Sequence, residues 1–293
     1  QTANEIKTVF HFPESDILRP NFAAIYNDIN KGDKPYKLNT GNALWAQQDY
    51  PFLEEYLSTA EKYYGGKAAN LDFVRETEKS RRTINSFIEE QTNNKIKDLI
   101  PQGVLDTDTR LVLTNAIYFK GTWEWEFDKS ETTEQDFKIT PNDIIKVPMM
   151  YMNNDKAKFN YADLRDLQIL ELSYKGEEIS MLILLPKNNL DGIESSLTAE
   201  KLKEWKNQMQ ETKLDVIYLP KFEFDTKYFM KDTLSDMGMP TAFSGNADLS
   251  GMDGTRSLMI TEVIHQAYVK VDEEGTEAAA ATAVIIGKTS IGP

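Results

Sequence analysis

The segment that most constrains the fold is a run of small residues near the end of the chain, at residues 273–293 (EEGTEAAAATAVIIGKTSIGP). Helix propensity alone would allow an alanine-rich helix with an acidic first turn. Such a helix, however, would place Val284, Ile285 and Ile286 at successive positions around its axis. It would then lack a single apolar face with which to pack against the rest of the protein.

A strand fits this segment better, because its side chains then alternate between two faces. One face carries Thr276, Ala278, Ala280, Thr282, Val284 and Ile286, and the other carries Glu277, Ala279, Ala281, Ala283 and Ile285. Glu277, the only charge among them, is expected to point outward. Small side chains would let the strand slide between two existing strands, and Gly275 would supply the backbone angles of a hinge. We therefore expect a strand that can lie inside a sheet or outside it.

The rest of the chain shows both helical and strand periodicity. Helical spacing of apolar residues covers residues 16–30, 51–64 and 76–90, with Pro51 suited to a first turn and Gly65 to a helix end. Further helices are expected at 198–210, capped by Thr198, and near 228–237. Strand signals cover residues 110–120, 179–185, 215–224 and 258–272, with shorter candidates at 146–150, 158–161 and 171–174.

The order of these elements indicates the fold class. Helices and strands are interleaved without a regular βαβ rhythm, which favours a mixed α/β (α+β) domain built on a large, mostly antiparallel sheet. Residues 111–119 are nearly all apolar or uncharged, as expected of a central strand covered on both faces. No Gly- or Pro-rich linker divides the chain, so we expect a single domain.

Composition excludes several classes of function. The chain has 33 Lys and Arg against 47 Asp and Glu, and its net charge of −14 argues against a nucleic-acid partner. It has no cysteine and only two histidines, His11 and His265, so thiolate chemistry is excluded and imidazole chemistry nearly so. The longest apolar run, at residues 179–186, is too short to span a membrane.

Searches for catalytic and metal-binding motifs return little. The sequence contains no nucleophile elbow, zinc-protease helix or phosphate-binding loop. His265 lies in an apolar strand pattern, where a hydrogen-bonded core histidine is more frequent than a catalytic one. Asp248 and Asp253 lack the spacing of metal ligands. We expect no catalytic residue, no metal site and no cofactor, and hence a protein that is not an enzyme.

Several motifs resemble those of the serpin family. Residues 269–282 (VKVDEEGTEAAAAT) closely resemble the serpin hinge, and residues 113–123 (LTNAIYFKGTW), with Phe127 at the usual spacing, resemble the central strand. Residues 84–96 resemble the helix that crosses the serpin sheet, 42–45 (NALW) a further strand, and 263–267 (VIHQA) the shutter histidine segment. The resemblance implies the serpin fold, in which smaller sheets and helices surround the central sheet. Residues 1–293 would then form one serpin domain that lacks the family's N-terminal helices and C-terminal strands.

The resemblance also implies an inhibitor of proteases that acts as a suicide substrate. A protease cleaves the reactive-centre loop within residues 273–293, and the freed hinge inserts into the sheet before the acyl-enzyme is hydrolysed. The family's register places the reactive bond between Thr289 and Ser290, or alternatively between Lys288 and Thr289. Asn115 and His265 are expected to form a hydrogen-bonded shutter that controls sheet opening. The hinge comprises Glu274, Gly275, Thr276, Glu277, Ala278, Ala279, Ala280, Ala281 and Thr282.

The residues at the reactive bond suggest several target proteases. Thr289 suits elastase-like or subtilisin-like pockets, whereas Lys288 suits a trypsin-like pocket with a buried carboxylate. We therefore expect broad specificity that extends to cysteine proteases, and the stretch VIIGKTS resembles the loop of a bacterial multi-target family member. A monomer in an extracytoplasmic compartment is also expected. The alternative is a non-inhibitory serpin-fold carrier or chaperone, which the small residues 278–281 disfavour; a hydrolase is disfavoured by the shortage of histidine.

Overall fold

A computed structural model describes residues 1–140 and 142–289 of the chain. The α-helices are α1 (Thr2–Val9), α2 (Ser15–Ile29), α3 (Glu54–Tyr64), α4 (Thr77–Gln91), α5 (Leu190–Glu194), α6 (Ala199–Lys206), α7 (Lys231–Asp236) and α8 (Ser250–Asp253), and the 3₁₀-helices are η1 (Lys129–Glu131) and η2 (Pro240–Phe243). The strands are β1 (Lys37–Gln47), β2 (Lys67–Leu71), β3 (Thr109–Thr122), β4 (Thr133–Thr140), β5 (Asp143–Met152), β6 (Phe159–Asp163), β7 (Leu167–Ser173), β8 (Ser180–Pro186), β9 (Gln210–Thr212), β10 (Ile217–Pro220), β11 (Phe222–Phe229), β12 (Leu258–Val271) and β13 (Gly275–Lys288).

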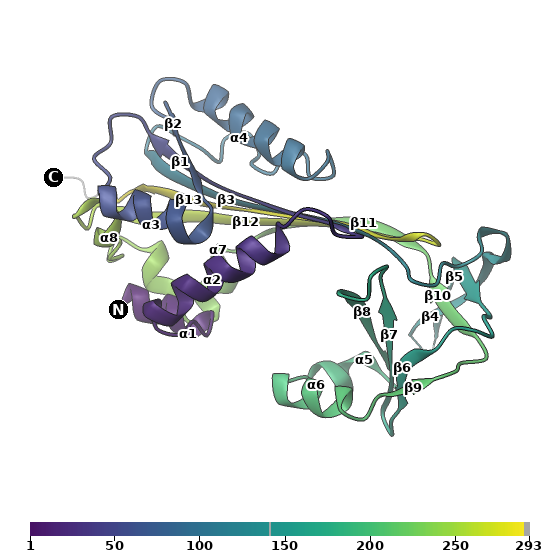
Figure 1. Cartoon of the computed structure of the whole chain (residues 1–293). Coiled ribbons are helices and arrows are strands. Elements are labelled where there is room, and N and C mark those ends of the chain that lie inside the picture. Colours follow the sequence, from purple (N-terminus) through teal and green to yellow (C-terminus); the bar gives the residue numbers. More distant parts are fainter. Residues whose placement is uncertain (141, 290–293) are drawn as a thin grey trace.

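The largest sheet has the strand order β11-β12-β13-β3-β1-β2. Every neighbouring pair in it is antiparallel except β1 with β2, which is parallel. Two smaller sheets, with the orders β10-β5-β4 and β8-β7-β6-β9, lie together beyond one end of the large sheet (Figure 1). The expected fold class is confirmed: a large, mostly antiparallel sheet with smaller sheets and surrounding helices.

Helices cover both faces of the large sheet. The helix α4 crosses one face, while α1, α2, α3 and α7 lie on the other (Figure 1). Ile84 and Ile88 of α4 are fully buried in one hydrophobic cluster with residues of β3 and β13. A second cluster joins Leu44 of β1 and Leu111 of β3 to α7 and η2 on the opposite face. The central strands are therefore covered on both sides, as expected for β3.

Most of the expected elements are present, with shifted ends. The helix expected at 51–64 begins at Glu54, so Pro51 precedes it and does not form its first turn; its end is capped by Gly65 at φ +63°. The strand expected at 215–224 is two strands in different sheets, because the chain passes from β10 to β11 at Lys221. Among the described residues, no helix is both long and apolar enough to cross a membrane.

Candidate functional site: the hinge and its strand

The small-residue segment forms β13, a central strand of the large sheet. It is antiparallel to β12 on one side and to β3 on the other over almost its whole length. Gly275, at its start, lies opposite Thr122 of β3, and Ile286, near its end, lies opposite Leu111. In Figure 1 the strand runs in yellow along the length of the sheet. Both backbone edges of β13 are therefore engaged in ladder hydrogen bonds.

The two faces of β13 carry the alternation that the sequence predicts. Ala279, Ala281, Ala283 and Ile285 are at most 3% exposed and belong to the cluster beneath α4. On the opposite face, Ile286 is equally buried and packs in the second cluster, with Val284 beside it. The alanines share this cluster with Ile84 and Ile88 of α4 and with the segment after that helix, so a larger side chain in their place would have to displace buried neighbours.

A tight turn at residues 272–275 joins β12 to β13. The Gly275 amide donates to the Asp272 carbonyl at 3.2 Å, and the Asp272 amide donates to the Gly275 carbonyl at 3.0 Å. Trp123, the residue after β3, holds the turn, because its indole N–H donates to the Asp272 carbonyl and its backbone amide donates to the Glu274 carbonyl. Burial raises the pKa of Asp272, but hydrogen bonds from Lys270 and from amides of the turn outweigh it and lower that pKa.

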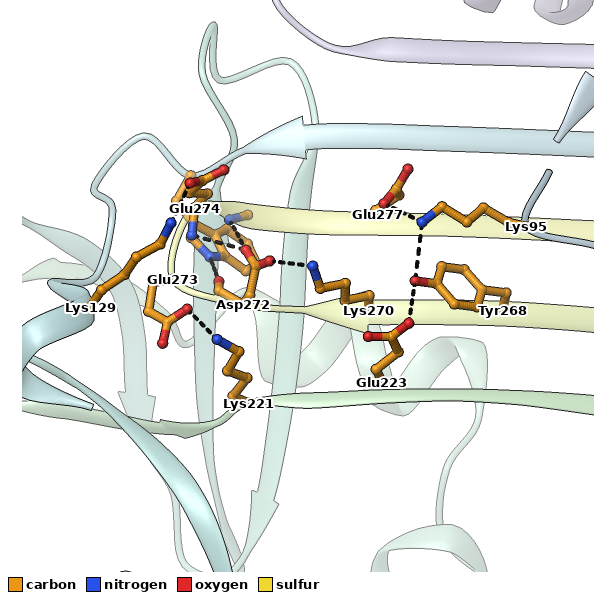
Figure 2. Close-up of polar contacts among 12 residues, drawn as sticks. Lys95, Lys129, Lys221, Glu223, Tyr268, Lys270, Asp272, Glu273, Glu274 and Glu277 are labelled. Atoms are coloured by element: carbon orange, nitrogen blue, oxygen red, sulfur yellow. Dashed lines mark hydrogen bonds and ion pairs between the residues drawn. The ribbon is translucent and has the colours of Figure 1, made fainter. Parts of the chain in front are cut away.

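Lysines pair with the three acids of this turn (Figure 2). The Glu273 side chain is only 3% exposed, and it accepts hydrogen bonds from Lys221 and from Thr132, both at 2.8 Å. Burial raises the pKa of Glu273, but these bonds outweigh it and hold the pKa below its ordinary value. An exposed ion pair joins Glu274 to Lys129 at 2.6 Å, and a partly buried one joins Asp272 to Lys270 at 3.0 Å. Each of the three acidic side chains of the turn is thus paired with a lysine.

Gly275 is required for a reason that differs from the expected one. Its φ does not lie in the left-handed region, so the residue supplies no unusual backbone angle. Instead, a Cβ at this position would lie 1.9 Å from the carbonyl oxygen of Gly121 and 2.9 Å from the Thr122 Cα. The start of β13 approaches the backbone of β3 so closely that only a glycine fits.

Glu277 also differs from expectation, since it does not point outward to solvent. Its side chain is 15% exposed and forms an ion pair with Lys95 at 2.9 Å. Its other carboxylate oxygen accepts a hydrogen bond from the hydroxyl of Tyr118 at 2.6 Å. The face of β13 that carries Glu277 is the face beneath α4, so the carboxylate is covered by the segment that follows this helix.

The two shutter candidates lie on either side of β13. Thr282 is opposite Asn115 on β3 and opposite His265 on β12. The His265 Nδ1 lies 2.9 Å from the Thr282 hydroxyl, while the Asn115 amide donates to the side chain of Asn42 at 2.7 Å. Asn42 and Asn115 also line an apolar cavity of about 720 Å³ between α2, α3 and the sheet. β13 therefore lies between Asn115 and His265, and each has a different hydrogen-bond partner.

The described residues of the expected reactive bond lie at the far end of β13. Lys288 is exposed and ends the strand, with its amide donating to the Asp108 carbonyl at 3.1 Å. The Thr289 amide donates to the Ser257 carbonyl at 2.8 Å. Ser290, the other expected partner in the reactive bond, lies outside the described residues. Among the described residues, no group of three or more His, Cys, Asp or Glu is placed to hold a metal ion.

Sequence reasoning missed the partners of the hinge and of the turn before it, namely Lys95, Tyr118, Trp123, Lys129 and Lys221. Trp123 lies inside a motif that the sequence singled out, but periodicity says nothing about the partner of an indole N–H. Lys95 and Lys221 come from segments remote in sequence, and single lysines in an acidic chain give no signal of pairing. Only the surplus of acids at 272–274 could have indicated that this turn needs cations nearby.

Comparisons with known proteins agree with this architecture. The family described as "Serpin (serine protease inhibitor)" matches residues 1–292. Human Serpin B3 is 43% identical over 97% of this chain, and human leukocyte elastase inhibitor is 41% identical over 97%; the chain spans 77% of the length of each. Among solved structures, emu ovalbumin superposes with a TM-score of 0.94 at 34% identity, covering 100% of this chain and 80% of its own. A loop-inserted structure of a cleaved ovalbumin mutant superposes with a TM-score of 0.92 at 31% identity, covering 98% of this chain and 80% of its own.

Proposed function

The chain belongs to the serpin family, and from this premise we propose that it inhibits proteases as a suicide substrate, with β13 as the inserted part of its reactive-centre loop. The observation that carries the proposal is the composition of β13 at its place in the sheet. A central strand whose covered side has alanine at three successive positions, 279, 281 and 283, can enter between β12 and β3 with little steric cost. The cleaved ovalbumin mutant with an inserted loop supports this interpretation.

The chemistry of inhibition belongs to the trapped protease. Its serine attacks the carbonyl carbon of Thr289, the bond to Ser290 breaks, and the amine of Ser290 leaves with a proton. The protease remains joined to Thr289 as an ester, which water would normally hydrolyse. Insertion of residues 275–288 competes with this hydrolysis, and it distorts the oxyanion hole on which deacylation depends.

The free energy for insertion comes from contacts that β13 makes only inside the sheet. Two ladders of backbone hydrogen bonds form, and Ile285 and Ile286 become buried. The strand has 14 residues, so full insertion places its C-terminal end about 45 Å from the hinge. The ester-linked protease would be carried to that far end of the sheet.

The proposed targets follow from Lys288, Thr289 and the relatives. Leukocyte elastase inhibitor is a relative whose name specifies an elastase, and Thr289 suits an elastase-like or subtilisin-like pocket. Cleavage after Lys288 would make trypsin-like enzymes second targets, and cysteine proteases that form thioester acyl-enzymes are further candidates. We place the shutter at Asn115 and His265 and the hinge at residues 274–282.

The test is to mix the full-length protein with trypsin, elastase and subtilisin in separate reactions. An SDS-stable complex at the summed mass of the two proteins, with mass spectrometry placing the ester on Thr289 or Lys288, is expected with at least one of them. Cleavage of the loop by all three without any complex would contradict inhibition. The melting temperature of the cleaved product then separates the alternatives, because a rise shows that the loop still inserts.

A non-inhibitory carrier or chaperone is the alternative within the same fold. Such a protein needs no insertable loop, yet Ala279, Ala281 and Ala283 are fitted to the space beneath α4. The location outside the cytoplasm and the monomeric state stay predictions. Cell fractionation with an antibody and sedimentation of the purified protein test them.

A further inference from the structure

The inserted strand carries a single acidic residue, Glu277, at its third position. This carboxylate is opposite Lys120 on β3 and opposite Lys270 on β12, while Lys270 in turn is opposite Glu223 on β11. Directly opposed residues of neighbouring strands share one face of a sheet. The row therefore alternates in charge across four strands, and β13 supplies the negative member between the two lysines.

Lys95 extends this row to the segment that follows α4. Its ammonium lies 2.9 Å from Glu277 and 3.4 Å from the Tyr268 hydroxyl, and 4.9 Å from the centre of the Tyr268 ring. The Tyr268 hydroxyl donates to Glu223 at 2.9 Å. Figure 2 shows the Lys95 side chain reaching from its own segment towards both Glu277 and Tyr268. One ammonium thus connects this segment to β13 and to β12.

A second contact from the same segment supports the connection. Asn93 donates to the Tyr118 hydroxyl at 3.3 Å, and that hydroxyl donates to Glu277 at 2.6 Å. Both Lys95 and Glu277 are largely covered, with side chains 27% and 15% exposed. A charge pair with this degree of burial is less screened by water and salt than a surface pair. Losing either partner would leave a partly buried charge unpaired.

We infer that Lys95 and Glu277 form a latch that fastens the segment after α4 onto β13 once the loop has inserted, and thereby holds the inserted state in place. The inference rests on the proposed function, because it assumes that Glu277 lies in an exposed loop before cleavage. Lys95 acts through Glu277 and not on the protease, so it is a positioning residue. Before insertion, Lys95 lacks its carboxylate partner and stabilises nothing through this pair.

The experiment compares full-length Lys95→Met with the matched control Lys97→Met, which removes one charge from an exposed position two residues along. Each variant is melted before and after loop cleavage, at one fixed concentration of guanidinium chloride. Lys95→Met should lower the melting temperature of the cleaved form by about 3–8 °C and leave the uncleaved form nearly unchanged. The cleaved form of Lys95→Arg should keep most of the wild-type melting temperature. Lys97→Met should change the melting temperature of neither the cleaved nor the uncleaved form.

A second variant keeps the test independent of folding. Glu277→Gln changes a residue of the exposed loop, so the uncleaved protein should fold as the wild type does. The melting temperature of its cleaved form should fall by as much as that of cleaved Lys95→Met. The melting temperature of the cleaved double variant should fall no further than that of either single variant. An equal drop in the cleaved and uncleaved forms of Lys95→Met, or additive losses in the double variant, would overturn the latch.

The same measurements separate the latch from the proposed function. If the wild type forms no complex with any protease but melts higher after cleavage, inhibition fails while the latch is still tested by the variants. If the wild type forms complexes and Lys95→Met behaves like Lys97→Met, the latch alone is wrong. If cleavage does not raise the melting temperature of the wild type, loop insertion fails and the latch is overturned with it.

Discussion

Gly275 shows how a single absent atom determines whether the hinge can close. The carbonyl oxygen of Gly121 occupies the position that a Cβ at residue 275 would need. Gly121 and Gly275 both lie in the backbone of central strands of the sheet. Neither can move without breaking ladder hydrogen bonds on β3 or β13. If the segment is an exposed loop before cleavage, as we propose, the tolerance of this position is set by the inserted state, since an exposed loop would accept any residue.

Gly275→Ala should convert the inhibitor towards an ordinary substrate. The forced displacement at the start of β13 is expected to cost the inserted state about 1–3 kcal/mol, as overpacking of a filled site does. The measurement is the ratio of SDS-stable complex to cleaved inhibitor, which should fall. Gly245→Ala is the matched control, because no atom lies within 4 Å of a Cβ built there. An unchanged ratio in Gly275→Ala would show that the hinge does not come this close to β3.

The stability of the inserted form should depend on pH through Glu277. Burial raises the pKa of this carboxyl, but hydrogen bonds from Lys95 and Tyr118 outweigh it, so the pKa lies below the ordinary value of 4.5. Lys120 lowers it further, and the facing groups Tyr268, Lys270 and Glu223 complete its surroundings. A carboxyl whose pKa is lower in the folded than in the unfolded state stabilises the folded form at pH values above its unfolded-state pKa. This stabilisation is lost as the pH falls through its folded-state pKa.

The corresponding measurement is the difference in unfolding midpoint between cleaved wild type and cleaved Glu277→Gln. The difference should be largest above about pH 5 and should shrink as the pH falls towards about 3, because glutamine does not titrate. A difference that stays constant over this range would mean that the charge of Glu277 contributes nothing.

At the scale of the element, β13 is asymmetric across its two faces. The face beneath α4 is filled by alanines in a cluster with Ile84 and Ile88, whereas Ala278 and Ala280 on the other face are only partly buried. The cluster formed with α4 and the segment after it therefore limits side-chain size on one face more strictly than on the other. The alternation of the sequence states which residues share a face, but the residues that cover the sheet decide which face must stay small.

Ala281→Leu and Ala280→Leu form a matched pair that tests this asymmetry. The leucine at 281 must displace neighbours in this filled cluster and is expected to cost the inserted state about 1–3 kcal/mol, while the leucine at 280 should cost clearly less. Thermal unfolding of the cleaved forms reports the difference. Equal losses would show that the two faces of β13 are packed equally tightly.

At the scale of the whole molecule, the large sheet connects all the parts that the hinge uses. β13 touches β12 and β3 along its length, and the turn before it contacts η1 and the chain next to β10 through Lys129 and Lys221. Exchange of amide hydrogens should reflect this arrangement. Amides of residues 276–287 should exchange rapidly in the uncleaved protein and be among the slowest after cleavage.

Hydrogen exchange followed by mass spectrometry on both forms checks this expectation. The small sheet β10-β5-β4 serves as an internal reference, because its exchange should change little on cleavage. Slow exchange of residues 276–287 before cleavage would mean that the strand is already inserted in the intact protein, and would contradict the proposed inhibition.

The sequence predicted the sheet and its central strand because period-two alternation at 276–286 and the apolar run at 111–119 are strong local patterns. It could not predict that Glu277 is covered, because the covering lysine comes from a segment remote in sequence. It assigned Gly275 to backbone angles because close approach to Gly121 depends on the pairing of β13 with β3. Local periodicity thus found the elements, whereas contacts between distant segments set the roles of individual residues.

The alternation of side chains along β13 also restricts the length of the loop. The loop must be long enough to span the sheet, and its number of residues must change by an even number if each side chain is to keep its face. Deleting one residue from the alanine run would turn every following side chain to the opposite face, so that Thr282 and Val284 would take the buried places of Ala281 and Ala283. Deleting two residues would keep the faces correct and shorten the strand by about 7 Å. Viable changes in the length of this segment should therefore come in even steps.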